Sequence, residues 1–146
     1  MILHPPIRLY YCSQLAISEW RGVVMMNRLF IWVEIPVTDM ERAKAFYERI
    51  LQFELQSMIL GDEEYAFFPI KEEQNGGALV KGPHHIPSPD GVRVYVDGSP
   101  DLAAVLSRVR EAGGEVIMEK TYVGDHGGYI GKFIDSEGNR IGLQHL

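Results

Sequence analysis

The chain of 146 residues is long enough for one domain with a real core, and its single cysteine, Cys12, excludes an internal disulfide and favours the reducing cytoplasm. Its 14 basic and 20 acidic side chains give a net charge of −6 without any run of Lys or Arg, so we expect neither nucleic acid nor an anionic membrane as a partner. No stretch contains the about 18 apolar residues that a membrane-spanning helix needs.

Residues 1–26 lack the regular pattern of a helix or a strand. Prolines and charged residues interrupt any apolar core that a signal peptide would need. We therefore expect this segment to be an N-terminal extension outside the fold, and we expect one folded domain over residues 27–146. The alternative is an ordered arm that packs on the domain through its aromatic side chains, Tyr10, Tyr11 and Trp20.

Residues 27–82 are predicted to form a strand, a helix and three further strands. In the first strand, aliphatic side chains at the odd positions alternate with Trp32 and Glu34. Thr38 and Glu41 then form the pattern of a capping box, and apolar residues at helical spacing follow. The three further strands are expected at residues 52–58, 64–70 and 78–81.

The same order of elements is predicted for residues 90–146, after a proline-rich linker. A strand at residues 91–96 precedes a helix that Ser99 would cap, with Pro100 in the first turn. Three strands follow at residues 115–119, 129–135 and 140–146.

The chain therefore contains an internal duplication, in which Val37 corresponds to Val96. Two copies of a βαβββ module, at residues 27–82 and 90–146, predict an α+β fold. We expect a cupped mixed sheet, built from two four-stranded sheets, that encloses a cavity and carries the helices outside.

Strand alternation predicts which side chains face this cavity. If the aliphatic positions pack against the helices, Trp32 and Glu34 face inward from the first strand, Arg93 and Tyr95 from the fifth, and Gln144 from the last. Aromatic walls with few polar anchors are typical of a small-molecule pocket. The alternative is a filled core, in which Glu34 and Arg93 neutralise each other and the two aromatic rings occupy the cavity.

The histidines give weaker signals. His84 and His85 are adjacent, so they point in opposite directions on an extended chain, and we expect them in a solvated linker. Asp125 and His126 belong to a glycine-rich turn. His145 lies on the packed face of the last strand, where a structural role is expected.

Four segments have an informative order and spacing: residues 33–39, residues 42–47, residues 76–80 and residues 135–141. Together with the duplication, they resemble the vicinal oxygen chelate superfamily, which includes glyoxalases, bleomycin resistance proteins and extradiol dioxygenases. The resemblance implies a glyoxalase-like fold of paired βαβββ modules, and commonly a homodimer.

The metal enzymes of this superfamily place one His, Glu or Gln ligand on each of four strands. The resemblance puts these positions at Trp32, Ala78, Gly91 and Gly142, and none of these side chains binds a divalent metal. We therefore expect no metal and no other cofactor.

Three functions are compatible with the pattern. In the first, the protein binds a small organic ligand without a metal: Arg93 anchors an oxygen, Glu34 accepts from a donor, and Trp32 and Tyr95 stack on the ligand. In the second, it is a lyase or isomerase with Glu34 as general base. In the third, it is a non-catalytic dimeric module with a filled cavity.

Overall fold

The computed structural model describes residues 30–71 and 74–146. The first module contains β1 (Trp32–Pro36), α2 (Met40–Leu51), β2 (Gln56–Leu60), β3 (Glu63–Phe67) and β4 (Gly76–Lys81). The second contains β5 (Tyr95–Asp97), α3 (Leu102–Glu111), β6 (Glu115–Tyr122), β7 (Tyr129–Ile134) and β8 (Arg140–His145). The predicted extension and the predicted domain start at residue 27 lie outside the described residues.

The strands form two mixed four-stranded sheets, in the orders β1-β4-β3-β2 and β5-β8-β7-β6. The first strand of each module pairs parallel with the last, and the remaining pairs are antiparallel. Within the described residues, the first strand of each module therefore forms one edge of its sheet. The prediction of tandem βαβββ modules is confirmed.

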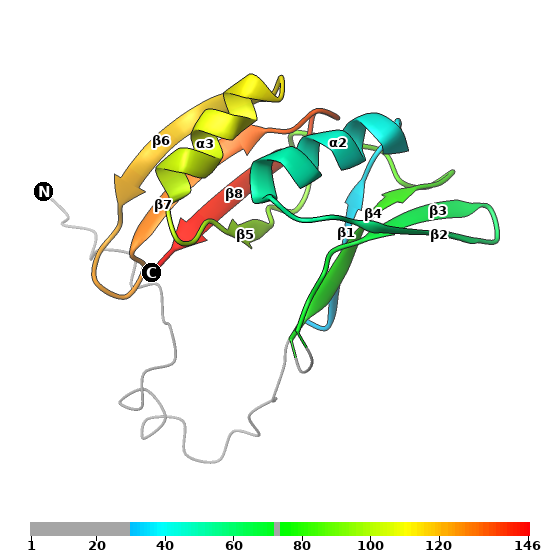
Figure 1. Cartoon of the computed structure of the whole chain (residues 1–146), viewed down its shortest axis with the longest axis horizontal. Helices are drawn as coiled ribbons and strands as arrows, with labels where there is room; N and C mark the ends of the chain where they lie inside the picture. The colour runs from blue at the N-terminus through cyan, green and yellow to red at the C-terminus, as the bar shows by residue number, and fades with distance from the viewer. Residues whose placement is uncertain (1–29, 72–73) are drawn as a thin grey trace, which may run out of the picture.

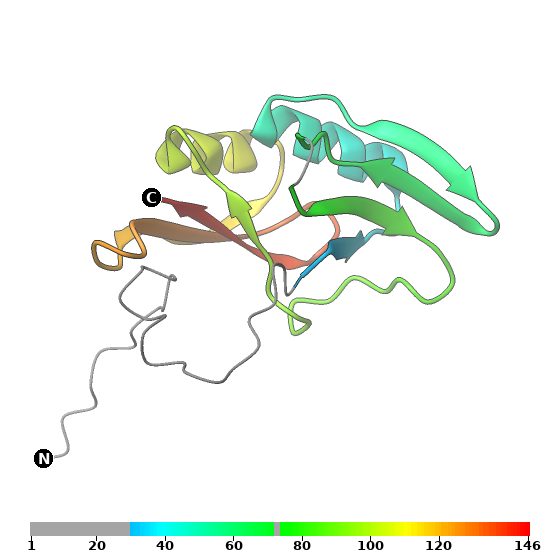
Figure 2. The same ribbon diagram turned by 90° about the horizontal axis from the view of Figure 1, so that it is seen from below.

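Both helices lie on the same side of the molecule, above the strands (Figure 1). Helix α2 contacts β3 and β4, helix α3 contacts the strands β6, β7 and β8, and the two helices contact each other. Figure 2 shows from below how the strands of the two modules lie side by side. One apolar core joins the modules, since Phe46 of α2 lies 6.0 Å from Phe133 of β7 between ring centroids.

The internal repeat has a different register from the one predicted. Val37 N donates to Val80 O at 2.9 Å at the end of the β1–β4 pair, and Gly98 N donates to Gln144 O at 2.8 Å at the end of the β5–β8 pair. Val37 therefore matches Gly98, not Val96. A shift of two residues leaves every side chain on its predicted face.

Strand β5 is shorter than the predicted strand at residues 91–96. Residues Tyr95–Asp97 pair with residues 142–144 of β8. Val94 O also accepts a hydrogen bond from Gly142 N at 2.8 Å, and the strand does not extend further toward residue 91.

Both helices begin later than the sequence pattern predicted. The N-cap of α2 is Asp39 rather than Thr38: the Asp39 side chain accepts from Arg42 N, whereas the Thr38 hydroxyl donates to Glu137 Oε1 at 3.1 Å. The N-cap of α3 is Asp101 rather than Ser99. In both cases the aspartate side chain accepts a hydrogen bond from the backbone of the first turn, which satisfies one of its unpaired N–H groups.

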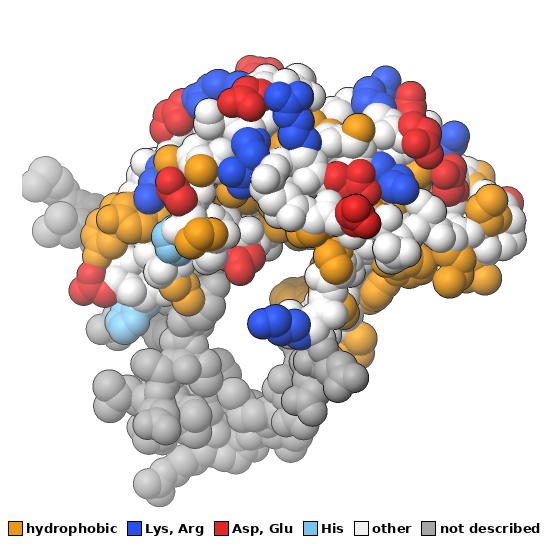
Figure 3. Space-filling view, viewed as in Figure 1, with side chains coloured by type: hydrophobic (Ala, Val, Ile, Leu, Met, Phe, Trp, Pro, Cys, Tyr) orange, Lys and Arg blue, Asp and Glu red, His pale blue; other side chains and the backbone are white. Residues whose placement is uncertain are grey.

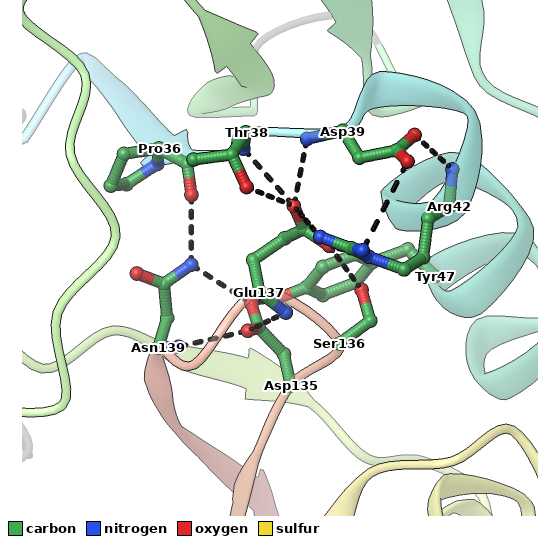
Figure 4. Close-up of polar contacts among 9 residues, drawn as sticks. All are labelled: Pro36, Thr38, Asp39, Arg42, Tyr47, Asp135, Ser136, Glu137 and Asn139. Atoms are coloured by element: carbon green, nitrogen blue, oxygen red, sulfur yellow. Dashed lines mark hydrogen bonds and ion pairs between the residues drawn. The ribbon is translucent and has the colours of Figure 1, made fainter.

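The turn between β7 and β8 connects the two modules (Figure 4). Glu137 from this turn accepts hydrogen bonds from Thr38 N at 3.0 Å, Asp39 N at 2.9 Å and Arg42 Nε at 2.7 Å. Burial raises the pKa of the Glu137 carboxyl, but these hydrogen bonds outweigh burial and lower the pKa to about 2. A carboxylate of the second module thus accepts hydrogen bonds from the backbone at the N-terminus of the first module's helix, α2.

Asp135 and Asn139 add a buried polar network beside this turn. Tyr47 of α2 donates to Asp135 Oδ2 at 2.7 Å, and Asn139 Nδ2 donates to Pro36 O at 2.8 Å. Asn139 Oδ1 accepts from Ser88 N at 3.1 Å. The network therefore positions the end of β1 and the segment that leads to β5, which are the parts of the chain around the site.

Candidate functional site

The face of the first sheet that points away from the helices, called the inner face here, carries an aromatic wall. Ile35 and Ala66 are buried in the core, so their neighbours along β1 and β3 point to the opposite side. The side chains at these alternate positions are Trp32, Glu34, Tyr65 and Phe67. Ring centroids are 5.9 Å apart for Trp32 and Phe67, and 5.7 Å apart for the stacked rings of Tyr65 and Phe67.

In both modules an aromatic ring lies on a glycine of the neighbouring strand. Trp32 pairs with Gly76, where a Cβ would lie 2.7 Å from Cζ3 of the indole. Tyr95 pairs with Gly142, where a Cβ would lie 2.5 Å from two carbons of the phenol ring. Only glycine leaves room for the ring at either position.

His85 joins two carboxylates of the inner face. Its Nε2 lies within hydrogen-bond distance of Glu34 Oε2, at 2.8 Å, whereas its Nδ1 lies 3.5 Å from Glu63 Oε1 and has no hydrogen-bond partner among the described residues. Trp32 Nε1 donates to the other oxygen of Glu34 at 3.2 Å. Since the His85 side chain is only 17% exposed, the prediction of a solvated linker histidine is wrong for this residue.

Glu34, His85 and Glu63 are called the Glu34–His85–Glu63 row below. Glu63 also accepts a hydrogen bond from a tyrosine. Tyr65 donates from its hydroxyl to Glu63 Oε2 at 2.6 Å. This hydrogen bond, followed by burial and by the negative charges of Glu34 and Glu63, raises the pKa of Tyr65 to about 12. The inner face of the first module is therefore aromatic and acidic.

A cavity of about 340 Å³ runs along the edge strand β1. Trp32 and Glu34 line it from the first module, and Arg140 lines it from the start of β8. The Nε atom of Arg140 is buried and has no hydrogen-bond partner among the described residues. The remaining wall is mainly apolar and includes Phe30, Ile86, Val92, Val94 and Ile141.

A second cavity of about 500 Å³ lies beside the turn between β2 and β3. Glu63 and His85 line this cavity, whereas Glu34 lines the smaller one. The Glu34–His85–Glu63 row therefore connects the walls of two cavities.

The other predicted site residues lie away from the cavity along β1. Arg93 is exposed, does not line this cavity, and forms no ion pair with Glu34. Tyr95 and Gln144 line a separate depression of about 320 Å³ together with Asp97, and Gln144 Nε2 donates to Gly127 O at 3.0 Å. The structure thus brings Trp32 and Glu34 together and separates them from the other three.

The side chains at the four positions that the resemblance assigned to metal ligands do not fit a metal. Trp32, Ala78 and Gly142 offer no coordinating side-chain atom, and the observed register moves the third position from Gly91 to Arg93, whose guanidinium carries donors only. Within residues 30–71 and 74–146, no group of three or more His, Cys, Asp or Glu is arranged to hold an ion. His85 uses opposite ring nitrogens toward its two carboxylates, so the row cannot chelate one ion.

Sequence reasoning missed His85 and Arg140 as site residues. Alternation along β8 places Arg140 on the same side of the strand as Gln144, which was predicted to face the cavity, and this was the available signal. For His85 no periodic pattern exists, because it lies in an irregular segment whose path depends on tertiary contacts.

Comparisons with known proteins support the fold. The family model for the Glyoxalase/Bleomycin resistance protein/Dioxygenase superfamily matches residues 29–143. A glyoxalase/bleomycin resistance protein from Streptomyces sp. CB03234 is 25% identical, with a TM-score of 0.59 over 78% of this chain and 97% of that one. Glyoxalase I from Leishmania major is 15% identical, with a TM-score of 0.62 over 81% and 86%.

A third solved structure, TnmS3, is described as an antibiotic binding protein from Streptomyces sp. CB03234. It is 23% identical, with a TM-score of 0.53 over 83% of this chain and 98% of that one. A comparison with curated protein sequences gives no match. In the part of the chain that the structure describes, neither helix is long and apolar enough to cross a membrane.

Proposed function

Because the chain belongs to the Glyoxalase/Bleomycin resistance protein/Dioxygenase superfamily, we propose that it binds a small organic molecule, without a metal, in the cavity along β1. The observation that carries this proposal is a mainly apolar cavity of about 340 Å³ whose wall contains few polar side chains, among them Glu34 and Arg140. Arg140 Nε has no partner among the described residues, and the guanidinium group carries only donors, so a ligand oxygen can accept from its other N–H groups.

The proposed ligand contacts come from three side chains. Trp32, at 44% exposure, offers an indole face to an apolar or aromatic part of the ligand. Glu34 accepts from a ligand donor, and Arg140 takes the anchoring role that the sequence pattern suggested for Arg93. In this proposal Tyr95 and Gln144 contact the ligand only if it is large enough to extend beyond the cavity.

Binding without a metal agrees with the side chains at the four family ligand positions. Restoring a carboxylate at Gly142 would also require moving Tyr95, since even a Cβ at that position meets its ring. We therefore propose that the aromatic–glycine pairs have replaced the metal centre.

A thermal-shift screen of small organic compounds tests binding. We expect hits that raise the Tm of the native protein, that persist with a chelator, and that are lost in Trp32→Ala. Tyr122→Ala, which removes another exposed aromatic ring on β6, is the matched control and should keep the hits. A screen without hits, or stoichiometric zinc or nickel together with glyoxalase activity, would contradict the proposal.

The second candidate function is a lyase or isomerase in which Glu34 is the general base. The contact of 2.8 Å between Glu34 and His85 favours it, because a carboxylate–histidine pair can move a proton. Glu34→Gln should then abolish turnover at saturating substrate, whereas Glu111→Gln, on the surface of α3, should not. Unchanged turnover in Glu34→Gln would exclude this role.

We also propose that the protein is a cytoplasmic homodimer. Hydrophobic side chains gather along the lower side of the β2–β3 hairpin (Figure 3), and Met58, Ile59 and Leu60 of the edge strand β2 are all more than half exposed. An apolar edge strand is a surface that proteins usually cover. Light scattering during gel filtration should give twice the monomer mass, and Ile59→Lys should shift it to the monomer.

A further inference from the structure

Two opposite charges line the cavity along β1 without pairing with each other. Glu34 and Arg140 both belong to its wall, and Glu34 pairs with His85 instead. Opposite charges in one mainly apolar cavity normally pair directly, since each is costly to bury alone. Their separation leaves both of them available to a ligand.

Glu34 has accepting capacity left. One of its oxygens accepts from Trp32 Nε1 at 3.2 Å, and the other contacts His85 Nε2 at 2.8 Å. An ionised carboxylate has about four lone-pair positions, so about two stay open. The side chain is 34% exposed, so a ligand donor can reach it. The two existing contacts also fix the orientation of the carboxylate before a ligand binds.

Arg140 Nε has no acceptor among the residues that the structure describes. Its neighbour Asn139 does not serve, because Asn139 Oδ1 already accepts from Ser88 N, and its Nδ2 donates to Pro36 O and Asp135 Oδ2. A guanidinium group carries donors only, and carboxylates match its planar geometry. An acidic group on a ligand would therefore match the Arg140 guanidinium best.

We propose that the ligand of this cavity is amphoteric, with an acidic group bound to Arg140, a protonated amine bound to Glu34, and an aromatic or apolar body against Trp32. This inference rests on the proposed function of the cavity and specifies its ligand class. At about 340 Å³ the cavity is near the lower end of ligand pockets, which favours a molecule of amino-acid size.

Calorimetry with three matched probes tests this class. Phenylalanine carries both charges, 3-phenylpropionate carries only the acid, and phenethylamine carries only the amine. We expect phenylalanine to bind the native protein about tenfold more tightly than either analogue, because each lost charge-assisted hydrogen bond in a shielded site costs about that factor. Arg140→Gln should remove the preference over phenethylamine, and Glu34→Gln the preference over 3-phenylpropionate.

Controls separate charge from folding. Arg49→Gln and Glu111→Gln make the same changes in an exposed ion pair elsewhere and should keep both preferences. Arg140→Lys keeps the charge and should retain most of the preference over phenethylamine, and unchanged Tm values show that the variants are folded.

Equal binding of the three probes, or binding only of uncharged compounds in the thermal-shift screen, would overturn the amphoteric ligand and leave the proposed function intact. The absence of any ligand, including these probes, would overturn the proposed function itself.

Discussion

Glu137 Oε2 lies 2.7 Å from Arg42 Nε, although the two residues are 95 positions apart and belong to different modules. The Glu137 side chain is fully buried, whereas Arg42 is 54% exposed. Thr38 and Asp39 donate from the backbone to the same carboxylate. The contact therefore does for α2 what a capping box does locally, but it links the modules as well.

Replacing Glu137 with Gln should destabilise the protein by about 1.5–3 kcal/mol, because a hydrogen bond to a charged group contributes about that much. The amide keeps an acceptor for the backbone N–H groups and loses the charge that Arg42 needs. Urea unfolding of both proteins measures the difference. Glu111→Gln, which breaks an exposed pair with Arg49, is the control and should cost less than about 1 kcal/mol. Equal losses in the free energy of unfolding for the two variants would show that the Glu137–Arg42 pair contributes no more than an exposed ion pair.

Glu137 should also make the stability of the protein depend on pH. The pKa of Glu137 is about 2 in the folded protein and about 4.5 as the ordinary value. A lowered folded-state pKa gives stability that is complete above the unfolded value and is lost as pH falls from about 4.5 toward 2. The free energy of unfolding of the native protein should therefore fall more steeply in this range than that of Glu137→Gln. Parallel pH profiles would contradict the assignment.

How far the sequence predicts this fold depends on the range of the interactions. The alternation in β1 and the helical spacing in α2 follow from local burial, and both elements form as predicted. The N-cap of α2 is Asp39 rather than Thr38, and the hydroxyl and backbone N–H of Thr38 instead donate to Glu137, 99 residues away. No local pattern encodes such a contact.

The same limit applies to the candidate site. Period-two alternation predicted that Trp32 and Glu34 share a face, and the structure places them on the face opposite the core. In the filled-core alternative the partner of Glu34 was Arg93, on a regular strand, whereas the structure pairs Glu34 with His85, in a segment without period. The path of that segment depends on Asn139, which holds Ser88 N, so the position of His85 follows from tertiary packing.

The aromatic–glycine pair of β5 and β8 should be coupled in stability. Gly142→Ala places a Cβ 2.5 Å from the Tyr95 ring, and forcing extra atoms into an occupied space costs about 1–3 kcal/mol. In a Tyr95→Ala background the same change should be nearly neutral. A double-mutant cycle by urea unfolding measures the coupling. Gly91→Ala, with only Ser88 O within 4 Å, is the matched control and should show none.

The titration of Tyr65 should report how close the carboxylates of the inner face are. Its pKa of about 12 arises chiefly from the hydrogen bond to Glu63, and the charge of Glu34 adds to the shift. Glu63→Gln should therefore bring the pKa of Tyr65 down toward the ordinary value near 10, and Glu34→Gln should lower it by less. Carbon NMR of labelled tyrosine, followed from pH 9 to about 13 and assigned by the signal lost in Tyr65→Phe, distinguishes this residue from the six other tyrosines. Titration of Tyr65 near 10 in the native protein would mean that Glu63 points elsewhere, and the Glu34–His85–Glu63 row would then lose its second carboxylate.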